Sequence, residues 1–221
     1  MKFEAILFDF DGVLIESEES GNRHIADYLS RIGHPTTAEQ SMANFMGLAG
    51  ADFLAAVERW IGRPLPDDFA EERRIENDRC IAEGIAEVAG AVAFVRALPA
   101  ALPRAVVSSS RPPWLHAHLA HLGLTDAFGA HVYSGAVDVA RGKPAPDLYL
   151  HAAERLGVPI GRCAIIEDSP VGATGAVASG GHVIGLVAGT HCGPDHADRL
   201  RAIGVHAVAR DFAEVARELG L

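Results

Sequence analysis

Cysteine, basic side chains and long apolar runs are all scarce in this chain of 221 residues. Its cysteines, Cys80, Cys163 and Cys192, are odd in number, widely spaced and form no CxxC pair. That pattern favours a reducing compartment over a disulfide framework. No apolar run approaches the roughly 20 residues of a transmembrane helix, and apolar strand residues follow Met1 and Lys2 so closely that we expect no signal peptide. The sequence therefore predicts a cytoplasmic protein without a membrane partner.

Basic residues are too few to favour a polyanionic partner. Lysine and arginine total 19 against 29 acidic residues, and the net charge is −10. This balance argues against nucleic acid as a partner, although a small phosphorylated metabolite could still bind through local cations or backbone amides. A hydrophobic content of 49% and a charged content of 22% are those of an ordinary globular protein. The length allows one large domain, or a core domain with a smaller insert.

Two carboxylates end the first apolar segment of the chain. Residues 4–8 have the character of a buried strand, and Asp9 and Asp11 follow it, with Gly12 next. Residues two apart on a strand share a face, so both acids point the same way. Like charges about 4 Å apart repel by roughly 4 kcal/mol at an effective dielectric near 20, and a divalent cation is the simplest neutraliser. A solvated acidic turn is the alternative, but apolar residues 13–15 argue against it. Asp9 and Asp11 are therefore the candidate reaction centre.

The sequence pattern of the rest of the chain changes near residue 88, from helices alone to alternating strands and helices. Helical periodicity and helix boundary signals predict four helices, from 17 to about 32, from 37 to 45, from 53 to 61 and from 67 to about 81. Beyond them, strands at 104–107, 131–133, 163–166 and 182–187 alternate with helices at 91–98, 112–122, 147–156, 170–179 and 212–220. Such alternation predicts an α/β fold, a Rossmann-like parallel sheet covered on both faces. We expect residues 1–15 and 88–221 to form this core, and residues 16–87 to form an inserted α-helical domain.

Polar side chains follow several predicted strands. Reactive groups collect at the carboxyl ends of parallel strands, and these ends carry Asp9 and Asp11, then Ser108, then Lys143, then Glu167 and Asp168. Acids for a metal, a hydroxyl and one ammonium could together hold a phosphoryl group. Each part has a simpler interpretation alone: residues 108–110 as a helix-capping cluster with Ser110 as the cap, Lys143 as a solvent lysine, and the acids at 167–168 as helix N-terminal acids.

Four motifs in this order resemble a known family. They are DFDGV at 9–13, AVVS at 105–108, GKPAPD at 142–147 and IIEDSPVG at 165–172. With them the chain resembles haloacid-dehalogenase-superfamily phosphatases, in the subgroup whose helical cap is inserted after the first motif, similar to β-phosphoglucomutase and sugar-phosphate phosphatases. The resemblance covers essentially the whole length.

The resemblance implies a role for each candidate residue. Asp9 would be the nucleophile that forms an aspartyl phosphate, and Asp11 the general acid and base. Mg²⁺ would be held by Asp9, the backbone carbonyl of Asp11, Asp168, and Glu167 directly or through water. Ser108, the amide of Ser109, and Lys143 would bind the phosphoryl oxygens. The implied activity is Mg²⁺-dependent hydrolysis of a small phosphate monoester, by analogy a sugar phosphate or phosphorylated sugar acid, and we expect a monomer.

Other activities of the same superfamily fit less well. A β-phosphoglucomutase-like mutase would have a cap histidine near Gly21 and a phosphate-binding arginine near Gly50, and both positions are glycine. Dehalogenases lack the second aspartate, whereas Asp11 is present, and a phosphonatase needs a cap lysine, whereas residues 16–87 contain none. A non-catalytic binding protein on this fold would have lost a catalytic group, and none is lost.

The remaining candidates have ordinary interpretations. His116, His118 and His121 share one predicted helix and are expected to face solvent, since three zinc ligands at that spacing cannot converge. Arg73 and Arg74 lie in a charge run typical of a solvated helix face, and they are also weak candidates for binding a distal acid of the substrate. The tryptophans at 60 and 114 are expected in the core.

Overall fold

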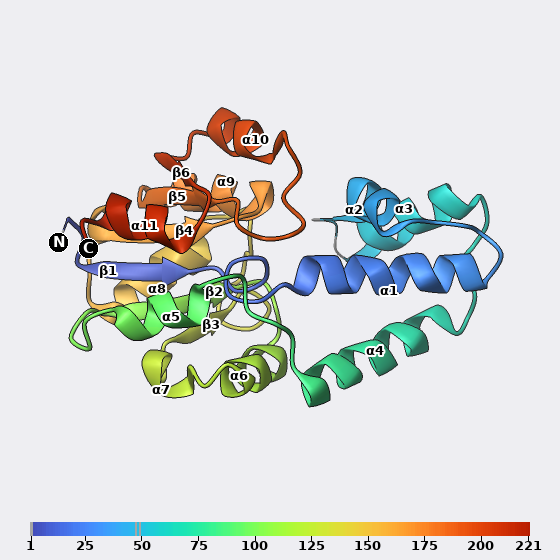
Figure 1. Ribbon diagram of the computed structural model, residues 1–221, viewed down its shortest axis with the longest axis horizontal. Coiled ribbons are helices and arrows are strands. Elements are labelled where there is room, and N and C mark those ends of the chain that lie inside the picture. The colour runs from blue at the N-terminus through green and yellow to red at the C-terminus, as the bar shows by residue number, and fades with distance from the viewer. Residues whose placement is uncertain (1, 47, 49) are drawn as a thin grey trace. The chain divides into compact units, whose positions relative to one another are not determined.

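The computed structural model describes residues 2–46, 48 and 50–221, and Figure 1 shows its elements. The chain divides into two compact units. Met1–Glu16 and Ala86–Leu221 form the first, called the sheet unit here, and Ser17–Ile85 form the second, called the helical unit. The chain leaves and re-enters the sheet unit through paired segments, because the Glu16 amide donates to the Ala86 carbonyl at 2.9 Å and Ile15 bridges Glu87 in antiparallel fashion.

The sheet unit is built on six parallel strands, as predicted for the fold class. They are β1 (Ala5–Phe8), β2 (Arg104–Ser108), β3 (Val132–Ser134), β4 (Cys163–Glu167), β5 (His182–Leu186) and β6 (Ala207–Ala209). Their order is β3-β2-β1-β4-β5-β6, so the chain order reverses between β1 and β4, where ligands of open α/β sheets bind beyond the carboxyl ends. Phe8 pairs with Val106 on one side and Ile166 on the other, and the carboxyl ends of the three central strands therefore lie level.

Helices cover both faces of this sheet (Figure 1), which explains why the middle residues of its central strands are apolar and buried. The helices are α5 (Ala91–Ala97), α6 (Pro112–His121), α7 (Thr125–Phe128), α8 (Asp147–Leu156), α9 (Pro170–Ser179), α10 (His196–Ile203) and α11 (Phe212–Leu219), with a short 3₁₀ turn at Ile160–Arg162. Leu7 and Ile165 face α8 and α9 on one side. On the other, the ring of Phe8 meets the edges of Phe94 and Phe128, and Phe94 meets Phe212.

The helical unit contains the four helices expected from the sequence. They are α1 (Ser17–Arg31), α2 (Ala38–Phe45), α3 (Gly50–Ile61) and α4 (Phe69–Glu83). Thr37 caps α2 and forms a reciprocal pair of bonds with Gln40, the pattern of a capping box. A separate apolar core, with Tyr28, Phe45 and Phe69 among its rings, holds the bundle together. α2 ends at Phe45, as predicted, and Gly47, which the sequence suggests as its stop signal, lies outside the described residues.

Four short elements were not predicted. They are α7, the 3₁₀ turn, α10 and β6. Each is at most eight residues long, α10 buries only one apolar side chain, and β6 consists of one valine between two alanines, so none shows a clear pattern. Conversely, β2 and β4 run one residue further than predicted, so that Ser108 and Glu167 are the last residues of their strands. Among the described residues, no helix combines the length and the hydropathy needed to cross a membrane.

Candidate active site

The carboxyl ends of the central strands hold a cluster of buried carboxylates. Asp9 follows β1 and its amide still donates to Ile166 at 2.9 Å, which fixes it beside β4. Carboxylate oxygens of Asp9, Glu167 and Asp168 all lie within 4.8 Å of one another. The side chain of Lys143, only 4% exposed, places Nζ at 2.6 Å from Asp9 Oδ1 and 2.5 Å from Glu167 Oε1. Four residues predicted as site residues are thus brought together.

The electrostatics of this cluster are unbalanced. Burial and the neighbouring Glu167 and Asp168 raise the pKa of Asp9 well above its usual range, and Lys143 only partly opposes them. Burial works against the charge on Lys143, but contacts with Asp9 and Glu167 outweigh it and raise the pKa of that ammonium. Lys143 therefore keeps its proton, and this single ammonium contacts two of the three carboxyl groups, those of Asp9 and Glu167.

The donor set fits a hard divalent cation. Mg²⁺ prefers oxygen ligands, and the cluster offers carboxylate oxygens in a buried position that has too little positive charge of its own. Two glycines make room for these carboxylates. A Cβ on Gly12, whose φ is +81°, would lie 2.1 Å from Asp168 Oδ2, and one on Gly172 would lie 1.9 Å from Glu167 Oε1. The glycines of the first and fourth motifs are therefore required by the shape of the site.

Glu167 is held by a partner that the sequence analysis missed. The Tyr149 hydroxyl, from α8, donates to Glu167 Oε1 at 2.6 Å and lies 3.0 Å from the Gly172 carbonyl oxygen. The amide and hydroxyl of Ser169 contact Oε2 of the same carboxylate at 3.3 and 3.2 Å. Ser169 also caps α9, which begins at Pro170 as predicted. In the sequence Tyr149 is simply one apolar member of a helix stripe, and that pattern gives no sign of its contact with Glu167.

Asp11 lies among hydrogen-bond donors from the segment after β2. Oδ2 accepts from Ser110 Oγ at 2.6 Å and from Ser108 Oγ at 3.3 Å, and Oδ1 accepts from Trp114 Nε1 at 3.0 Å. Two predictions were wrong here. Ser110 is not the cap of α6, since Arg111 holds that position without a side-chain bond, and Trp114 is half-buried with its N–H on Asp11 instead of belonging to the core. Ser109 lies in the same turn and is exposed.

The three histidines of α6 differ from one another. His116 and His121 are exposed, as expected, but His118 is fully buried with its ring centroid 4.2 Å from that of Trp114. The prediction that it faces solvent was wrong, because its position on α6 points it inward next to Leu119. Burial lowers the pKa of His118. In the part of the chain that the structure describes, these histidines do not form a metal-type cluster.

Two further predictions concern the helical unit. Trp60 packs against its apolar core, as expected, and its Nε1 donates to Thr36 Oγ1 at 3.0 Å. Arg74 is exposed and pairs with Glu71 and Asp78 on its own helix. The suggestion that Arg73 or Arg74 binds an acid of the substrate stays a prediction.

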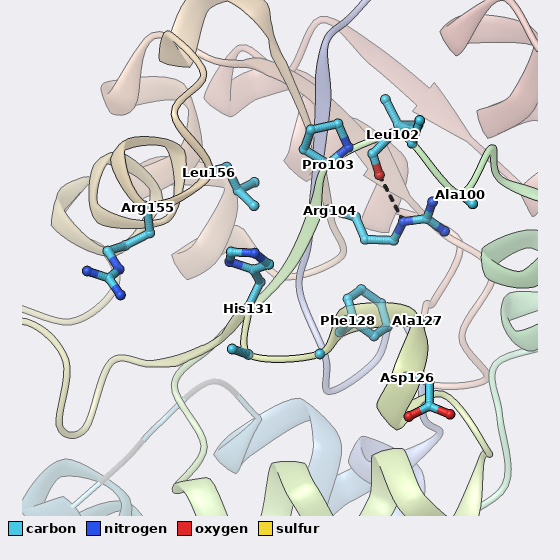
Figure 2. Close-up of a pocket in the computed structure, with 13 residues that line it drawn as sticks. Ala100, Leu102, Pro103, Arg104, Asp126, Ala127, Phe128, His131, Arg155 and Leu156 are labelled. Atoms are coloured by element: carbon cyan, nitrogen blue, oxygen red, sulfur yellow. Dashed lines mark hydrogen bonds between the residues drawn. The ribbon is translucent and has the colours of Figure 1, made fainter.

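A cavity of about 520 Å³ lies elsewhere in the sheet unit. Figure 2 shows its lining, which comes from the segments preceding β2 and β3 together with the end of α8. Arg104 begins β2, and its guanidinium donates to the backbone carbonyls of Leu102 and Val95 at 3.1 Å and of Pro99. Because this cavity adjoins the amino ends of strands whose carboxyl ends lead to the carboxylate cluster, it is not the candidate site.

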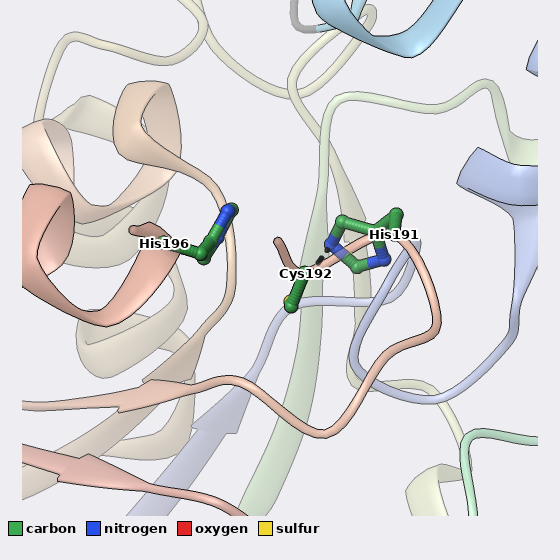
Figure 3. A group of neighbouring side chains, drawn as sticks. All are labelled: His191, Cys192 and His196. Carbon is green, nitrogen blue, oxygen red and sulfur yellow. Dashed lines mark hydrogen bonds between the residues drawn. The ribbon is translucent and has the colours of Figure 1, made fainter. Parts of the chain in front are cut away.

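The loop after β5 adds residues that the sequence analysis did not consider. His191 is buried and places Nε2 2.8 Å from Asp168 Oδ2, while Cys192 and His196 lie next to it (Figure 3). Their nearness to Asp168 follows from β5 lying beside β4 in the sheet, and a single-sequence pattern does not reveal it.

Comparisons with known proteins agree with this geometry. The model of haloacid dehalogenase-like hydrolases matches residues 3–180. Hexitol phosphatase A of Escherichia coli (strain K12) is 32% identical over 84% of this chain and 84% of its own, and 6-phosphogluconate phosphatase of the same organism is 28% identical over 87% and 86%. The crystal structure of a HAD family hydrolase from Deinococcus radiodurans R1, with bound phosphate and sodium, superposes with a TM-score of 0.86 at 34% identity, covering 99% of this chain and 96% of that one. The chain belongs to the haloacid dehalogenase-like hydrolase family.

Proposed function

We propose that this protein is a Mg²⁺-dependent phosphatase that hydrolyses a small phosphate monoester through an aspartyl phosphate on Asp9. The observation that carries the proposal is the buried ammonium of Lys143, in contact with both Asp9 and Glu167 at the carboxyl edge of the sheet. A fold seldom buries such a group unless its charge is needed, and a transferring phosphoryl group needs positive charge around its oxygens. The phosphatase names of the two curated relatives support the same reaction class.

The chemistry assigned to the side chains is a double displacement at phosphorus. A carboxylate oxygen of Asp9 attacks phosphorus, the bond to the leaving oxygen breaks, and Asp11 donates its proton to the departing alcohol. Asp11, now a carboxylate, takes a proton from a water whose oxygen attacks the same phosphorus. The bond to Asp9 then breaks, which releases phosphate and restores both carboxyl groups. Hydrogen bonds from Ser110 and Trp114, which lie after β2, fix the position of the Asp11 side chain.

Other residues hold the phosphoryl group and the cation. Ser108, the amide of Ser109, and the ammonium of Lys143 bind the phosphoryl oxygens in this proposal. Hydrolases of this family use a divalent metal; here the carboxylates of Asp9 and Asp168, the backbone carbonyl of Asp11, and Glu167 directly or through water would hold it. When bound, the cation neutralises charge on the carboxylates and on the phosphoryl oxygens.

We infer that the substrate is a sugar phosphate or a phosphorylated sugar acid. The inference comes from the names of two relatives, hexitol phosphatase A and 6-phosphogluconate phosphatase. Phosphomutase activity is the second candidate, and it has little support from this chain. Gly21 and Gly50 stand where the resemblance would place the cap histidine and arginine of a mutase.

Phosphate release tests the proposal directly. The purified chain is stripped with a chelator, and release of inorganic phosphate from p-nitrophenyl phosphate is measured without metal and with Mg²⁺. We expect turnover that depends on Mg²⁺ and that is lost in Asp9→Asn. A panel of phosphorylated sugars and sugar acids, compared by kcat/KM, then identifies the substrate class. Isomerisation of a sugar phosphate without free phosphate would support the mutase instead, and phosphate binding without any turnover would support a binding protein.

A further inference from the structure

Two imidazoles and a thiol meet beside the carboxylate cluster. His191 and Cys192 lie in the loop after β5, and His196 is the first residue of α10. One ligand atom from each lies within 4.8 Å of the other two (Figure 3). His191 and His196 are 6% and 2% exposed, and Cys192 is half-buried.

The atoms converge on a point that an ion could occupy. Nε2 of His191 is 3.4 Å from Sγ of Cys192 and 2.8 Å from Oδ2 of Asp168. Nε2 of His191 therefore has the thiol of Cys192 and the carboxylate of Asp168 as near neighbours. In a tetrahedral zinc site, bonds of about 2.0–2.1 Å to nitrogen and about 2.3 Å to sulfur place those two atoms roughly 3.5 Å apart. The observed separation of His191 and Cys192 matches that spacing.

The surrounding backbone makes space for the imidazole of His191. A Cβ on Gly189 would lie 2.5 Å from its Cε1, and a Cβ on Gly12 would lie 2.9 Å from the same atom. The loop is tied down by Thr190, whose amide and hydroxyl donate to Glu16 Oε2 at 3.0 and 2.8 Å. His196 places Nε2 2.6 Å from the backbone carbonyl oxygen of Asp168, the kind of outer contact that orients a metal-binding imidazole. The ring positions are therefore fixed by the fold.

We propose that His191, Cys192 and His196 form a binding site for Zn²⁺ beside the carboxylate site, with the Asp168 carboxylate, which the two sites share, completing the coordination. Imidazole and thiolate ligands select zinc-type ions, whereas magnesium prefers oxygen, so the two adjacent sites differ in the ion they take. On binding, the thiol proton of Cys192 passes to solvent and the thiolate binds the ion. Because Asp168 belongs to both ligand sets, Zn²⁺ in this site competes with the divalent ion of the carboxylate site. That last consequence rests on the proposed function.

Binding is tested with the whole chain and without any substrate. Co²⁺, a spectroscopic substitute for Zn²⁺, is added to stripped protein in excess Mg²⁺, and a thiolate-to-cobalt charge-transfer band is recorded. Zn²⁺ affinity is measured by competition with a chromophoric chelator. We expect one ion per chain, the charge-transfer band in the wild type, and loss of the band with at least tenfold weaker Zn²⁺ binding in Cys192→Ser. Cys80→Ser, in α4, is the matched control and should behave as the wild type.

A wild type without the band, or Cys192→Ser with unchanged Zn²⁺ affinity, would overturn the site. Circular dichroism establishes that each variant is folded, and His196→Asn gives a second test through loss of Zn²⁺ affinity with the thiol intact.

The competition for Asp168 is tested by titrating Zn²⁺ into the phosphatase assay at fixed Mg²⁺, with the rate of each variant scaled to its own zinc-free rate. We expect at least tenfold less sensitivity in Cys192→Ser than in Cys80→Ser. Equal sensitivity of the two variants to Zn²⁺ would reject the competition for Asp168. Absence of all turnover would reject the proposed function, and the Zn²⁺-binding measurements would then decide the proposed site alone.

Discussion

The charges of α4 and those of the carboxylate cluster are organised in opposite ways. On α4, Arg74 pairs with Glu71 and Asp78, and these partners are three or four residues away and mostly exposed. In the cluster, Lys143 pairs with Asp9, which is 134 residues away, and with Glu167, and all three side chains are at most 8% exposed. Local helix pairs arise readily from charge patterning. The cluster exists only because the sheet brings distant strand ends together.

The two arrangements also differ in what they contribute. Exposed pairs are screened by water and salt, so α4 would keep its structure if any one of them were lost. Burying charged groups costs several kcal/mol per ion, which the contacts among them only partly offset. The raised pKa of Asp9 is a direct sign of that cost. We interpret the cluster as a site retained for chemistry and the exposed face of α4 around Arg74 as a solvated surface, and variants in both regions test that distinction.

Asp9→Asn should show the largest contrast with Glu71→Gln. Removing the proposed nucleophile should lower kcat for p-nitrophenyl phosphate by a factor on the order of 10³ or more, whereas Glu71→Gln should leave it unchanged.

The thermal stability of Asp9→Asn should rise although its activity falls. Because folding raises the pKa of Asp9, the folded state holds that proton more tightly, and the metal-free protein loses stability as pH rises from the ordinary carboxyl range to the raised pKa. Asparagine has no proton to lose, so Asp9→Asn should melt at a higher temperature than the wild type at pH 7 in chelator. A lower melting temperature would contradict the account of the cluster.

Lys143→Met removes the ammonium and leaves three buried carboxyl groups together. Losing one partner of a buried ion pair typically costs about 3–5 kcal/mol, so we expect a marked fall in the unfolding free energy in chelator. Mg²⁺ should restore more stability to this variant than to the wild type, since the site is then more negative, while kcat should fall by a factor of roughly 10²–10³. Arg141→Met is the control, because Arg141 pairs with Asp147 at an exposed position. Urea unfolding with and without Mg²⁺ measures the unfolding free energy of both variants. Equal losses of unfolding free energy in Lys143→Met and Arg141→Met would contradict the distinction between buried and exposed charge.

The sequence predicts those parts of the site that lie at strand ends. Strand ends are marked by a change from apolar to polar residues, and parallel strands share an edge, so Asp9, Lys143, Glu167 and Asp168 could be placed together without coordinates. The apolar runs and helical spacing likewise sufficed for the sheet core and for the four helices of the helical unit. α10 buries a single apolar side chain, Leu200, which is too few to show a helical period, and β6 is Ala-Val-Ala, although alanine is depleted in strands.

Side chains on helices and loops could not be placed in the same way. Trp114 and Tyr149 lie on helices that cover the sheet, where an aromatic residue is ordinarily core, and their contacts with Asp11 and Glu167 depend on the rotation of each helix over the sheet. His118 was expected in solvent for the same reason, because the sequence fixes the spacing along α6 but not which face is buried. His191 approaches Asp168 through a loop whose path follows no repeating pattern.

Trp114→Phe should have an intermediate effect. The substitution keeps most of the ring and removes the N–H that donates to Asp11 Oδ1. If this donor positions the proposed acid and base, kcat should fall several-fold to about tenfold with little change in KM, because transition-state geometry is affected more than substrate binding. Trp60→Phe is a matched control, since it removes the same type of N–H from Thr36 Oγ1 in the helical unit. A general loss of stability would lower only the apparent kcat, in proportion to the unfolded fraction. Steady-state kinetics on both variants are therefore scaled to the folded fraction measured by circular dichroism, and a fall in kcat that remains in Trp114→Phe after this scaling supports positioning.

Arg74→Ala should have the smallest effect of all. Its guanidinium is exposed and bound to Glu71 and Asp78 on the same helix, so its removal should shift the melting temperature by no more than about 1 °C at low salt, and by less at high salt where screening has already weakened the pairs. Calorimetry at low and high ionic strength measures this change.

The kinetic test of Arg74→Ala uses two substrates, p-nitrophenyl phosphate and a phosphorylated sugar acid that carries a second negative group. If α4 is only a solvated surface, KM is unchanged for both. A rise in KM for the sugar acid alone would mean that Arg74 binds the second acid of the substrate. The local ion pairs of α4 would then be the resting state of a substrate-binding residue, and the contrast between the two charged regions would no longer separate chemistry from surface.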